Sequence, residues 1–593
     1  MDKLKINLRR DIALFQRTLA FIWDCSKTLT IIRLCLIFVQ SILPLIPLYL
    51  IKLLIDQIAA DVSQGIQDAW WILICFGAVQ LLTILVNNYA KYVTGLQADR
   101  VSIHMSRLVL NKSIELDLDH YDSNEYHNIY FRAQNEAGQR PIALLNAITD
   151  LAKQAMMLIA LAGLLMTLHW AIGLLMIIIV IPIAFVQLKF TKRFYVWKES
   201  STPTERKVNY LSRVLNTIPY AKEVRLFGFG SRIIDKYEGL RNQLFDEKKE
   251  ISKKQNVSLS FVQSIEALAT IGVLVFIVIR AVSGVISIGD IIMYFQAFQK
   301  GQSSIHSMLN SGVSLYQNRL FLEHIFRFFE LQPSIPKSQS TNPIDKSISS
   351  IKTKDVHFKY PGTSETVLEQ IDLEFKKGKL IALVGENGSG KTTLVKLLTR
   401  LYDPTQGLVE INGNNIKDYS VSDVRNKMTV IFQDFAQYSF TVAENIAISE
   451  SLDNIDMDRV KESAKLSGAN EFIDTLPDQY NTQLGKIFRN GIELSGGQWQ
   501  KIALARAFYR DADVIILDEP TSFIDPLAEG EIFSSLKKLA EDKILILVTH
   551  RLYNLKMADE IIVLDNGRIF EKGSHIELFD QKGKYYEMFS NQS

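Results

Sequence analysis

Residues 385–392 read Gly-Glu-Asn-Gly-Ser-Gly-Lys-Thr, and this stretch decides the fold of the C-terminal half. It matches the phosphate-binding loop GxxxxGK[ST], in which glycines let backbone N–H groups point at phosphates. The apolar run 380–384 precedes the loop, and a helical pattern follows it. The positive end of such a helix favours anions. The pattern predicts an α/β P-loop NTPase domain, with Lys391 at the β- and γ-phosphates and Thr392 at Mg²⁺.

A second acidic element lies further along the chain. The apolar run 514–517 predicts a buried strand, and it ends in Asp518 and Glu519. An acidic residue at such a strand end can organise Mg²⁺, and the next carboxylate can polarise an attacking water as general base. Taken alone, this pair is more often a strand end with solvated charges. Together with the phosphate loop, it predicts a site that hydrolyses a nucleotide.

The segment Leu-Ser-Gly-Gly-Gln at 494–498 lies between these two elements. With this segment the chain resembles the ATP-binding cassette (ABC) proteins, of which these five residues are the signature. The resemblance covers nearly the whole chain and is most specific over 350–575. It implies ATP and Mg²⁺ as cofactors. The residues it places at ATP are Tyr360, Gly385, Glu386, Asn387, Gly388, Ser389, Gly390, Lys391, Thr392, Thr393, Gln433, Ser495, Gly496, Gly497 and Gln498.

The resemblance also implies individual roles. Tyr360 stacks on adenine, where an ordinary strand aromatic is the alternative. Gln433 senses Mg²⁺, which Thr392 and Asp518 also hold, and couples to the membrane region. His550 contacts the γ-phosphate and completes the catalytic pair with Glu519, although a lone histidine at a strand end is usually structural or solvated. The implied magnesium set is Thr392, Gln433 and Asp518.

In members of this family the signature of one cassette faces the phosphate loop of another. This chain has one cassette, so the resemblance implies a partner: a second copy of the chain or a related half-transporter, with two composite sites. Residues 522–525 resemble the segment that crosses between the sites, with Ser522 and Asp525 matching. Phe523 stands where the family has a small residue, which bears on the coupling of the two sites.

The N-terminal half is built from long apolar runs. A membrane span needs roughly 20 apolar residues. Runs of this kind with few or no charges are 34–51, 69–90, 154–188, 257–279 and 286–307. The run 154–188 is long enough for two helices turning near His169 and Trp170, and the last two runs carry Glu266, Asp290 and Lys300. We expect a membrane domain of six transmembrane helices of the exporter type (type IV), against the alternative of buried helices in a large soluble protein.

Charge placement predicts the orientation. The connection 57–68 has no Lys or Arg, whereas the N-terminus and the segments 91–153 and 189–256 are rich in both. The positive-inside rule places both termini in the cytoplasm, and the expected location is a bacterial cytoplasmic membrane. The expected domains are 1–28, an N-terminal cytosolic or interfacial helix; 29–330, the six-helix membrane domain; 331–350, a Pro- and Ser-containing linker; and 351–593, the nucleotide-binding domain.

Membrane spans and a cassette on one chain resemble the exporter branch of the family. The resemblance implies alternating access driven by ATP, and coupling helices around 121–128 and 220–228. The second candidate contains Glu223 and Arg225 and is expected on the partner's cassette. A formal net charge of +2 argues against nucleic acid as a partner.

The cargo is less determined. Glu266 and Gln296 are candidates for a cargo cavity, because intramembrane polar groups often line one; hydrogen bonding between helices is the alternative. Segments 434–438 and 485–493 depart from the commonest exporter pattern and are similar to bacterial exporters of modified peptides. The expected cargo is a peptide or a small amphipathic molecule. The alternatives are a flippase for a lipid or lipid-linked sugar, a non-transport cassette ATPase and an ATP-gated channel.

Overall fold

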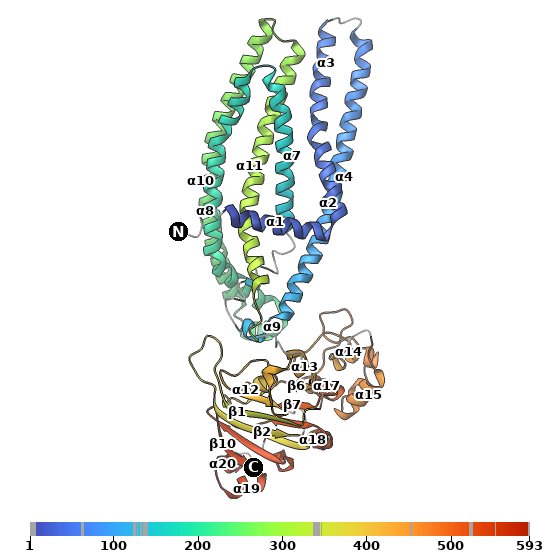
Figure 1. Cartoon of the computed structure of the whole chain (residues 1–593), viewed down its shortest axis with the longest axis vertical. Coiled ribbons are helices and arrows are strands. Elements are labelled where there is room, and N and C mark those ends of the chain that lie inside the picture. Colours follow the sequence, from blue (N-terminus) through green and yellow to red (C-terminus); the bar gives the residue numbers. More distant parts are fainter. Residues whose placement is uncertain are drawn as a thin grey trace. The chain divides into compact units, whose positions relative to one another are not determined.

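The computed structural model describes residues 8–60, 65–122, 126, 129–130, 133, 140–335, 344, 347–450, 454–520, 526–551 and 553–590. The chain divides into two compact units (Figure 1). The first contains Met1–Ile114 and His127–Leu331, and the second contains Glu115–Tyr126 and Gln332–Ser593. The short segment after residue 114 therefore belongs to the C-terminal unit, although the sequence on both sides of it belongs to the first.

The first unit is entirely helical among its described residues. Its helices are α1 (Leu8–Cys25), α2 (Lys27–Ile42), η2 (Leu43–Leu45), α3 (Ile46–Ala60), α4 (Gly65–Glu115), α7 (Arg140–Met166), α8 (Trp170–Asn216), α9 (Ile218–Leu226), α10 (Gly230–Val282) and α11 (Ile288–Glu330). The predicted hairpin is confirmed: α7 ends at Met166, α8 begins at Trp170, and His169 caps α8 by accepting a hydrogen bond from the Ala171 N–H.

Among the residues that the structure describes, five helical segments of this unit are long and apolar enough to cross a membrane. They are Lys27–Ala59, Ala69–Glu115, Arg140–Met166, Trp170–Asn216 and Gly230–Val282. The sixth predicted span lies in α11, which packs on α7 and α3. This helix is less apolar because it carries Asp290 and Lys300; Lys52 of α3 forms an ion pair with Asp290 at 2.7 Å.

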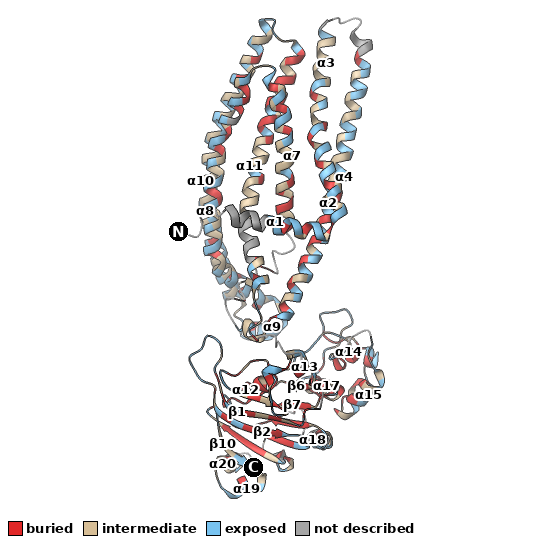
Figure 2. Ribbon diagram, viewed as in Figure 1, coloured by how far each residue is buried: buried red, intermediate tan, exposed pale blue. Residues whose placement is uncertain are grey.

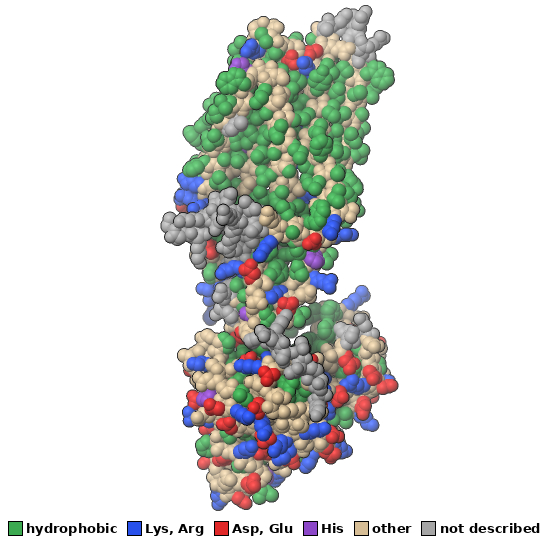
Figure 3. All heavy atoms as spheres, viewed as in Figure 1, with side chains coloured by type: hydrophobic (Ala, Val, Ile, Leu, Met, Phe, Trp, Pro, Cys, Tyr) green, Lys and Arg blue, Asp and Glu red, His purple; other side chains and the backbone are tan. Residues whose placement is uncertain are grey.

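The surface of these helices is apolar, whereas that of a soluble protein is mainly polar and charged. Large apolar side chains are exposed along α4 and α10, for example Leu85 at 65% and Leu268 at 69% (Figure 2). In Figure 3 hydrophobic side chains cover the visible face of these helices, and charged ones gather beyond the ends of this apolar zone. Such a surface is stable in hydrocarbon and costly in water, as expected of a membrane-spanning unit.

The second unit is an α/β domain with two sheets. A six-stranded sheet has the order β10-β9-β3-β8-β7-β6, and a four-stranded antiparallel sheet has the order β2-β1-β4-β5. The strands are β1 (Ser350–Phe358), β2 (Leu368–Lys376), β3 (Lys379–Val384), β4 (Gln406–Ile411), β5 (Asn414–Asn415), β6 (Met428–Ile431), β7 (Val514–Asp518), β8 (Ile544–Val548), β9 (Glu560–Asp565) and β10 (Arg568–Gly573).

The helices of this unit include one short piece from the first half of the sequence. They are α5 (Leu118–Tyr121), α12 (Lys391–Leu398), η3 (Ile416–Asp418), α13 (Val421–Asn426), α14 (Val442–Ile446), α15 (Met457–Leu466), α16 (Asn470–Ile473), η4 (Gln479–Asn481), α17 (Gly496–Tyr509), α18 (Pro526–Ala540), η5 (Tyr553–Met557), α19 (His575–Asp580) and α20 (Lys584–Ser590).

The six-stranded sheet positions the site. β6, β7, β8 and β3 pair in parallel, and every residue of β7 and β8 is buried. Apolar cores cover the sheet on both faces, which is why these strands read as continuous apolar runs. Parallel strands end at one edge, where ligands bind in open α/β sheets. The predicted functional residues follow four of these strands, so they meet at this edge.

Candidate functional site

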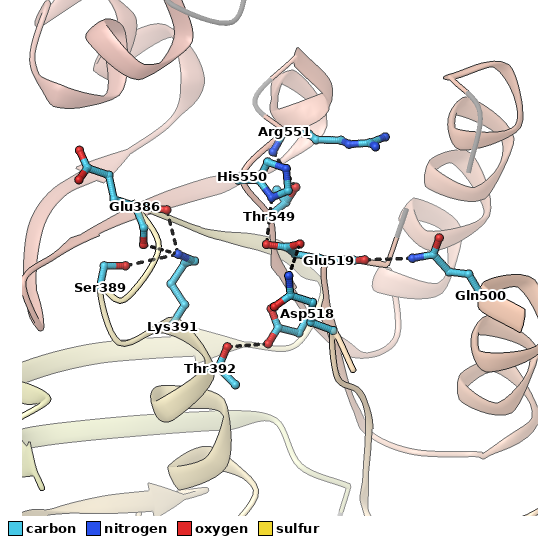
Figure 4. A network of polar contacts seen from close by, with 12 residues as sticks. Glu386, Ser389, Lys391, Thr392, Gln500, Asp518, Glu519, Thr549, His550 and Arg551 are labelled. Atoms are coloured by element: carbon cyan, nitrogen blue, oxygen red, sulfur yellow. Dashed lines mark hydrogen bonds and ion pairs between the residues drawn. The ribbon is translucent and has the colours of Figure 1, made fainter. Parts of the chain in front are cut away.

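A cavity of about 340 Å³ lies at the carboxyl edge of the large sheet. Most of the residues around it come from the ends of β3, β6 and β7. Figure 4 shows Lys391, Thr392, Asp518 and Glu519 among them. Those that carry the predicted chemistry are Asn387, Gly388, Gly390, Lys391, Thr392, Thr393, Gln433, Asp518 and Glu519. The fold thus brings together side chains that are more than a hundred residues apart in the sequence.

The phosphate loop connects β3 to α12, and two of its glycines are required by the geometry. At Gly385 φ is 152° and a Cβ would lie 2.1 Å from the Leu564 carbonyl oxygen; at Gly390 φ is 100° and a Cβ would lie 2.6 Å from a Leu368 methyl carbon. A side chain at Gly385 would collide with the backbone, and one at Gly390 would displace the flexible end of Leu368. At both positions the positive φ would also strain a residue other than glycine. The loop conformation therefore depends on glycine.

Lys391 folds back over this loop. Its Nζ donates to the carbonyl oxygens of Gly385 at 2.8 Å and Glu386 at 2.7 Å (Figure 4). Burial lowers the pKa of Lys391, and the nearby Asp518 and Glu519 oppose that shift. A third, longer hydrogen bond goes to Ser389 Oγ at 3.4 Å. An ammonium group with these internal acceptors can exchange them for phosphate oxygens, which are stronger partners.

Thr392 and Asp518 form a compact oxygen pair. The Thr392 hydroxyl donates to Asp518 Oδ2 at 2.8 Å, and the Asp518 side chain is buried (Figure 4). Burial raises the pKa of Asp518, which the hydrogen bond from Thr392 partly offsets. A hydroxyl and a carboxylate are the oxygen ligands that Mg²⁺ prefers. A dication would also relieve the cost of burying this carboxylate.

Both carboxylate oxygens of Glu519 have a partner predicted to act with it. Gln433 Nε2 donates to Oε2 at 2.9 Å. His550 Nδ1 lies 2.9 Å from Oε1 (Figure 4). The backbone of Glu519 has φ 51°, a left-handed conformation that is uncommon outside glycine, and its N–H donates to the Val548 carbonyl. The strand end and two side chains together fix the direction of this carboxylate.

The signature segment lies apart from this cavity. Ser495 caps α17, and its hydroxyl and the Gln498 side chain form a reciprocal capping box. Ser495 and Gly496 are exposed, and no residue of 494–498 is among the described residues that line the cavity. The exposed N-terminus of a 14-residue helix is suited to meet an anion.

Tyr360 lies beside the phosphate loop. Its hydroxyl is 3.0 Å from the Thr393 hydroxyl, and Lys396 Nζ is 5.3 Å from its ring centroid. Lys396 Nζ also donates to the Tyr360 hydroxyl at 3.4 Å, so it lies at the hydroxyl end of the ring. Tyr402 packs edge-on against Tyr360, with ring centroids 5.4 Å apart.

Sequence reasoning missed a contact that starts from Tyr402. The Tyr402 hydroxyl donates to Asp122 Oδ2 at 2.5 Å, across 280 residues of sequence. Arg425 also lies 3.8 Å from Asp117, and Leu118 of α5 packs on the core of the cassette. The segment around α5 is thus bound to the cassette beside Tyr360. It adjoins the predicted coupling region 121–128, of which the structure describes only residues 121, 122 and 126. The Tyr-Asp pair at 402–403 gave no signal by itself in the sequence.

Arg506 is a second residue that the motifs did not identify. It donates to the Asn445 and Ala436 carbonyl oxygens at 2.9 and 2.7 Å and lies over the Tyr438 ring. Burial lowers the pKa of Arg506 to about 10. This side chain fastens the signature helix to the segment that follows Gln433.

The remaining predicted residues lie elsewhere or outside the described residues. Glu266 in α10 pairs with His306 of α11 at 2.7 Å, so its partner is another helix. Gln296 is partly buried in α11, and Glu223 and Arg225 lie in α9. Ser522 and Asp525 are outside the described residues.

Comparisons with known proteins agree with this arrangement. Residues 368–522 match the ABC transporter family, and residues 29–300 match the ABC transporter transmembrane region. The subtilin transport ATP-binding protein of Bacillus subtilis is 32% identical over 96% of this chain and 92% of its own length. The nisin transport ATP-binding protein of Lactococcus lactis is 29% identical over 96% and 95%.

More distant proteins share the same architecture. An ATP-dependent lipid A-core flippase of Vibrio vulnificus is 26% identical, with 87% of each chain covered. The structure of a bacterial Atm1-family ABC exporter with ATP bound matches 96% of this chain and 98% of its own with a TM-score of 0.80 and 22% identity. The chain therefore belongs to the ABC transporters, as an exporter-type member that joins a membrane region to a domain that hydrolyses ATP to drive transport.

Proposed function

We propose that this chain is half of a peptide exporter of a bacterial cytoplasmic membrane, with both termini in the cytoplasm, that closes as a dimer on two ATP molecules. One observation supports the proposal that two chains form a dimer. The cavity holds Lys391, Asp518 and Glu519, whereas the signature at Ser495 is exposed and outside it. A site that needs both parts is completed by the signature of another copy or of a related half-transporter.

Within each site the chain's own residues divide the work. Bound together with ATP, Mg²⁺ would supply charge neutralisation at the phosphates, and Thr392, Asp518 and Gln433 would hold the ion. Glu519 accepts a proton from the attacking water, and His550 and Gln433 keep its oxygens aimed into the cavity. The burial of Asp518 and Lys391 keeps water away from the charges that act on the phosphates.

The second coupling region is α9, which contains Glu223 and Arg225. Two apolar side chains at the C-terminal end of this helix are exposed: the exposed fraction is 79% for Leu226 and 69% for Phe227. Exposed apolar groups beyond the membrane spans usually mark an interface. We assign α9 to a contact with the cassette of the partner chain.

The contact between Tyr402 of the cassette and Asp122 of the first coupling region can be tested with the substitution Tyr402→Phe. We expect cargo-stimulated ATPase activity to fall about fivefold, with basal ATPase activity within about twofold of the parent. The physical reason is the lost hydrogen bond to the Asp122 carboxylate, worth about 1 kcal/mol because Asp122 is exposed. The measurement is the ratio of stimulated to basal activity in proteoliposomes.

Tyr419→Phe is the matched control, since its hydroxyl contacts Asn414 inside the cassette and not α5. An unchanged ratio in Tyr402→Phe would mean that this contact does not transmit the state of the cassette.

The proposed cargo is a peptide, because the two relatives at 32% and 29% identity are named for subtilin and nisin transport. In inside-out vesicles that contain this protein, we expect ATP-dependent accumulation of lanthionine peptides such as nisin or subtilin, and several-fold stimulation of ATPase activity by them. Lipid A-core in the same vesicles is the comparison, because a flippase for that lipid is also a relative. Stimulation by lipid A-core alone would favour the flippase alternative.

A further inference from the structure

A cavity with mostly polar walls, called here the polar cavity, lies where three helices of the membrane unit meet. It has a volume of about 540 Å³ and is lined by α2, α4 and α7. Each helix contributes four positions spaced i, i+3, i+4 and i+7, which form one face of a helix. Nine of the twelve side chains that line the cavity carry nitrogen or oxygen, and the other three are Leu36, Ile37 and Ala90.

The polar cavity begins at the cytoplasmic boundary of the hydrocarbon and continues into it, given the orientation proposed above. Arg33 and Lys91 stand directly at the ends of the apolar runs of α2 and α4, and such flanking cations mark the membrane boundary. Gln40 lies seven residues further along α2, which is about 10 Å of helix. Its Nε2 donates to Asn87 Oδ1 at 2.8 Å. The walls are therefore polar at a depth where the surrounding acyl chains are apolar.

Hydrogen bonds between helices account for part of this polarity. The buried guanidinium of Arg33 donates at 2.6–3.1 Å to three neutral side-chain oxygens, those of Gln97, Asn146 and Thr149. These bonds join α2 to α4 and α7, which is a common use of polar groups in membrane helices. They do not neutralise the charge of the guanidinium, because none of the three acceptors is ionised.

Three other charged side chains of the polar cavity are not explained in this way: Lys91, Asp150 and Lys153. Their side chains form no hydrogen bond or ion pair within the described part of the chain. The Ser41 hydroxyl donates to the Lys153 backbone carbonyl at 3.3 Å, so Lys153 lies close to the depth of Gln40. Charged groups at this depth are costly and usually mark a functional site. With Arg33 the cavity has three cations and one carboxylate, a net of two positive charges.

We propose that the polar cavity binds a carboxylate of the peptide cargo at Lys91 and Lys153, where the cargo enters from the cytoplasm. This inference rests on the proposed export of a peptide. The amide and hydroxyl groups of the cavity can pair with backbone N–H and C=O groups, which find no partners in hydrocarbon. The excess of positive charge selects an acidic group of the peptide. Polar walls at acyl-chain depth suit a peptide better than the tail of a lipid.

The test compares nisin with nisin whose carboxyl groups have been converted to carboxamides. Binding to the full-length protein in phosphatidylcholine nanodiscs is measured by microscale thermophoresis. We expect the parent to bind nisin about fivefold more tightly than the amide, and Lys91→Gln with Lys153→Gln to remove this difference while binding of the amide stays as in the parent. The control is Arg100→Gln with Lys192→Gln, which removes two positive charges from α4 and α8 outside the cavity.

Asp150→Asn is expected to have an effect of the opposite sign. It removes the one carboxylate of the polar cavity, which repels a carboxylate of the cargo. We expect this variant to bind nisin about threefold more tightly than the parent does, with binding of the amide unchanged. A substitution that only damages the fold would not raise the affinity.

The outcomes separate this inference from peptide export itself. Equal binding of nisin and its amide by the parent, or a difference that persists in Lys91→Gln with Lys153→Gln, would overturn the inference and leave peptide export in place. Failure of both peptides to bind would overturn both proposals. Dihexanoyl-phosphatidylglycerol is the lipid probe. If the double variant loses binding of this lipid and keeps that of nisin, the cavity binds a lipid phosphate and the inference is wrong.

Discussion

Glu519→Gln is expected to lower the ATPase turnover number by about 10²- to 10⁴-fold while ATP still binds. Glutamine has nearly the same shape, so the contacts of residue 519 with Gln433 and His550 can be re-formed by the amide. What is lost is the carboxylate that we propose as the acceptor of the proton of the attacking water. Turnover is measured as phosphate release at saturating ATP, and binding is measured with a fluorescent ATP analogue.

Two features of the structure make this result diagnostic. Residue 519 has φ 51°, and both Glu and Gln have a Cβ, so the backbone strain is the same in parent and variant. Glu541→Gln is the control, because Glu541 is an exposed carboxylate in the turn after α18. If Glu519→Gln keeps an ATPase turnover number within a factor of ten of the parent's, the general base is a residue other than Glu519.

The sequence predicted which residues meet at the carboxyl edge of the large sheet, because its motifs sit at strand ends. A parallel sheet aligns the carboxyl ends of its strands whatever the loops do, so Lys391 after β3 and Glu519 after β7 had to approach one another. The hairpin at His169 was equally predictable from the sequence. The apolar run 154–188 is too long for one membrane span, so it must contain a turn between two helices. In both cases one local rule is enough.

Other features could not be predicted from the sequence, because they depend on contacts between residues that are far apart in it. The bond from Tyr402 to Asp122 joins residues 280 apart, and the sequence analysis places Asp122 in the membrane domain 29–330, whereas the structure groups it with the cassette. The left-handed backbone of Glu519 follows from its bond to Val548 on the neighbouring strand. The start of α7 at Arg140 was also not evident, because charged residues in the cytoplasmic extension ended the apolar run used to find the span.

Whether each ATP site is shared between two chains can be tested with two substitutions, placed either on separate copies of the chain or on the same copy, with the two copies of each dimer carrying different tags. Lys391→Ala removes the phosphate contact of one site, and Gly496→Asp places a negative charge at the signature, at the start of α17. If each site combines the loop of one copy with the signature of the other, a dimer of the two single variants keeps one intact site. The doubly changed copy paired with the parent keeps none.

We therefore expect about half of the parental ATPase activity from the dimer of single variants, and a loss of about 10²-fold or more from the dimer of the double variant with the parent. Sites contained within single copies predict the opposite order, because the unchanged copy would then work alone and each single variant would be inactive. Both dimers carry the same two substitutions, so any general loss of stability affects them equally. Only the distribution of the changes differs, and a reversal of the two activities would exclude a nucleotide shared between copies.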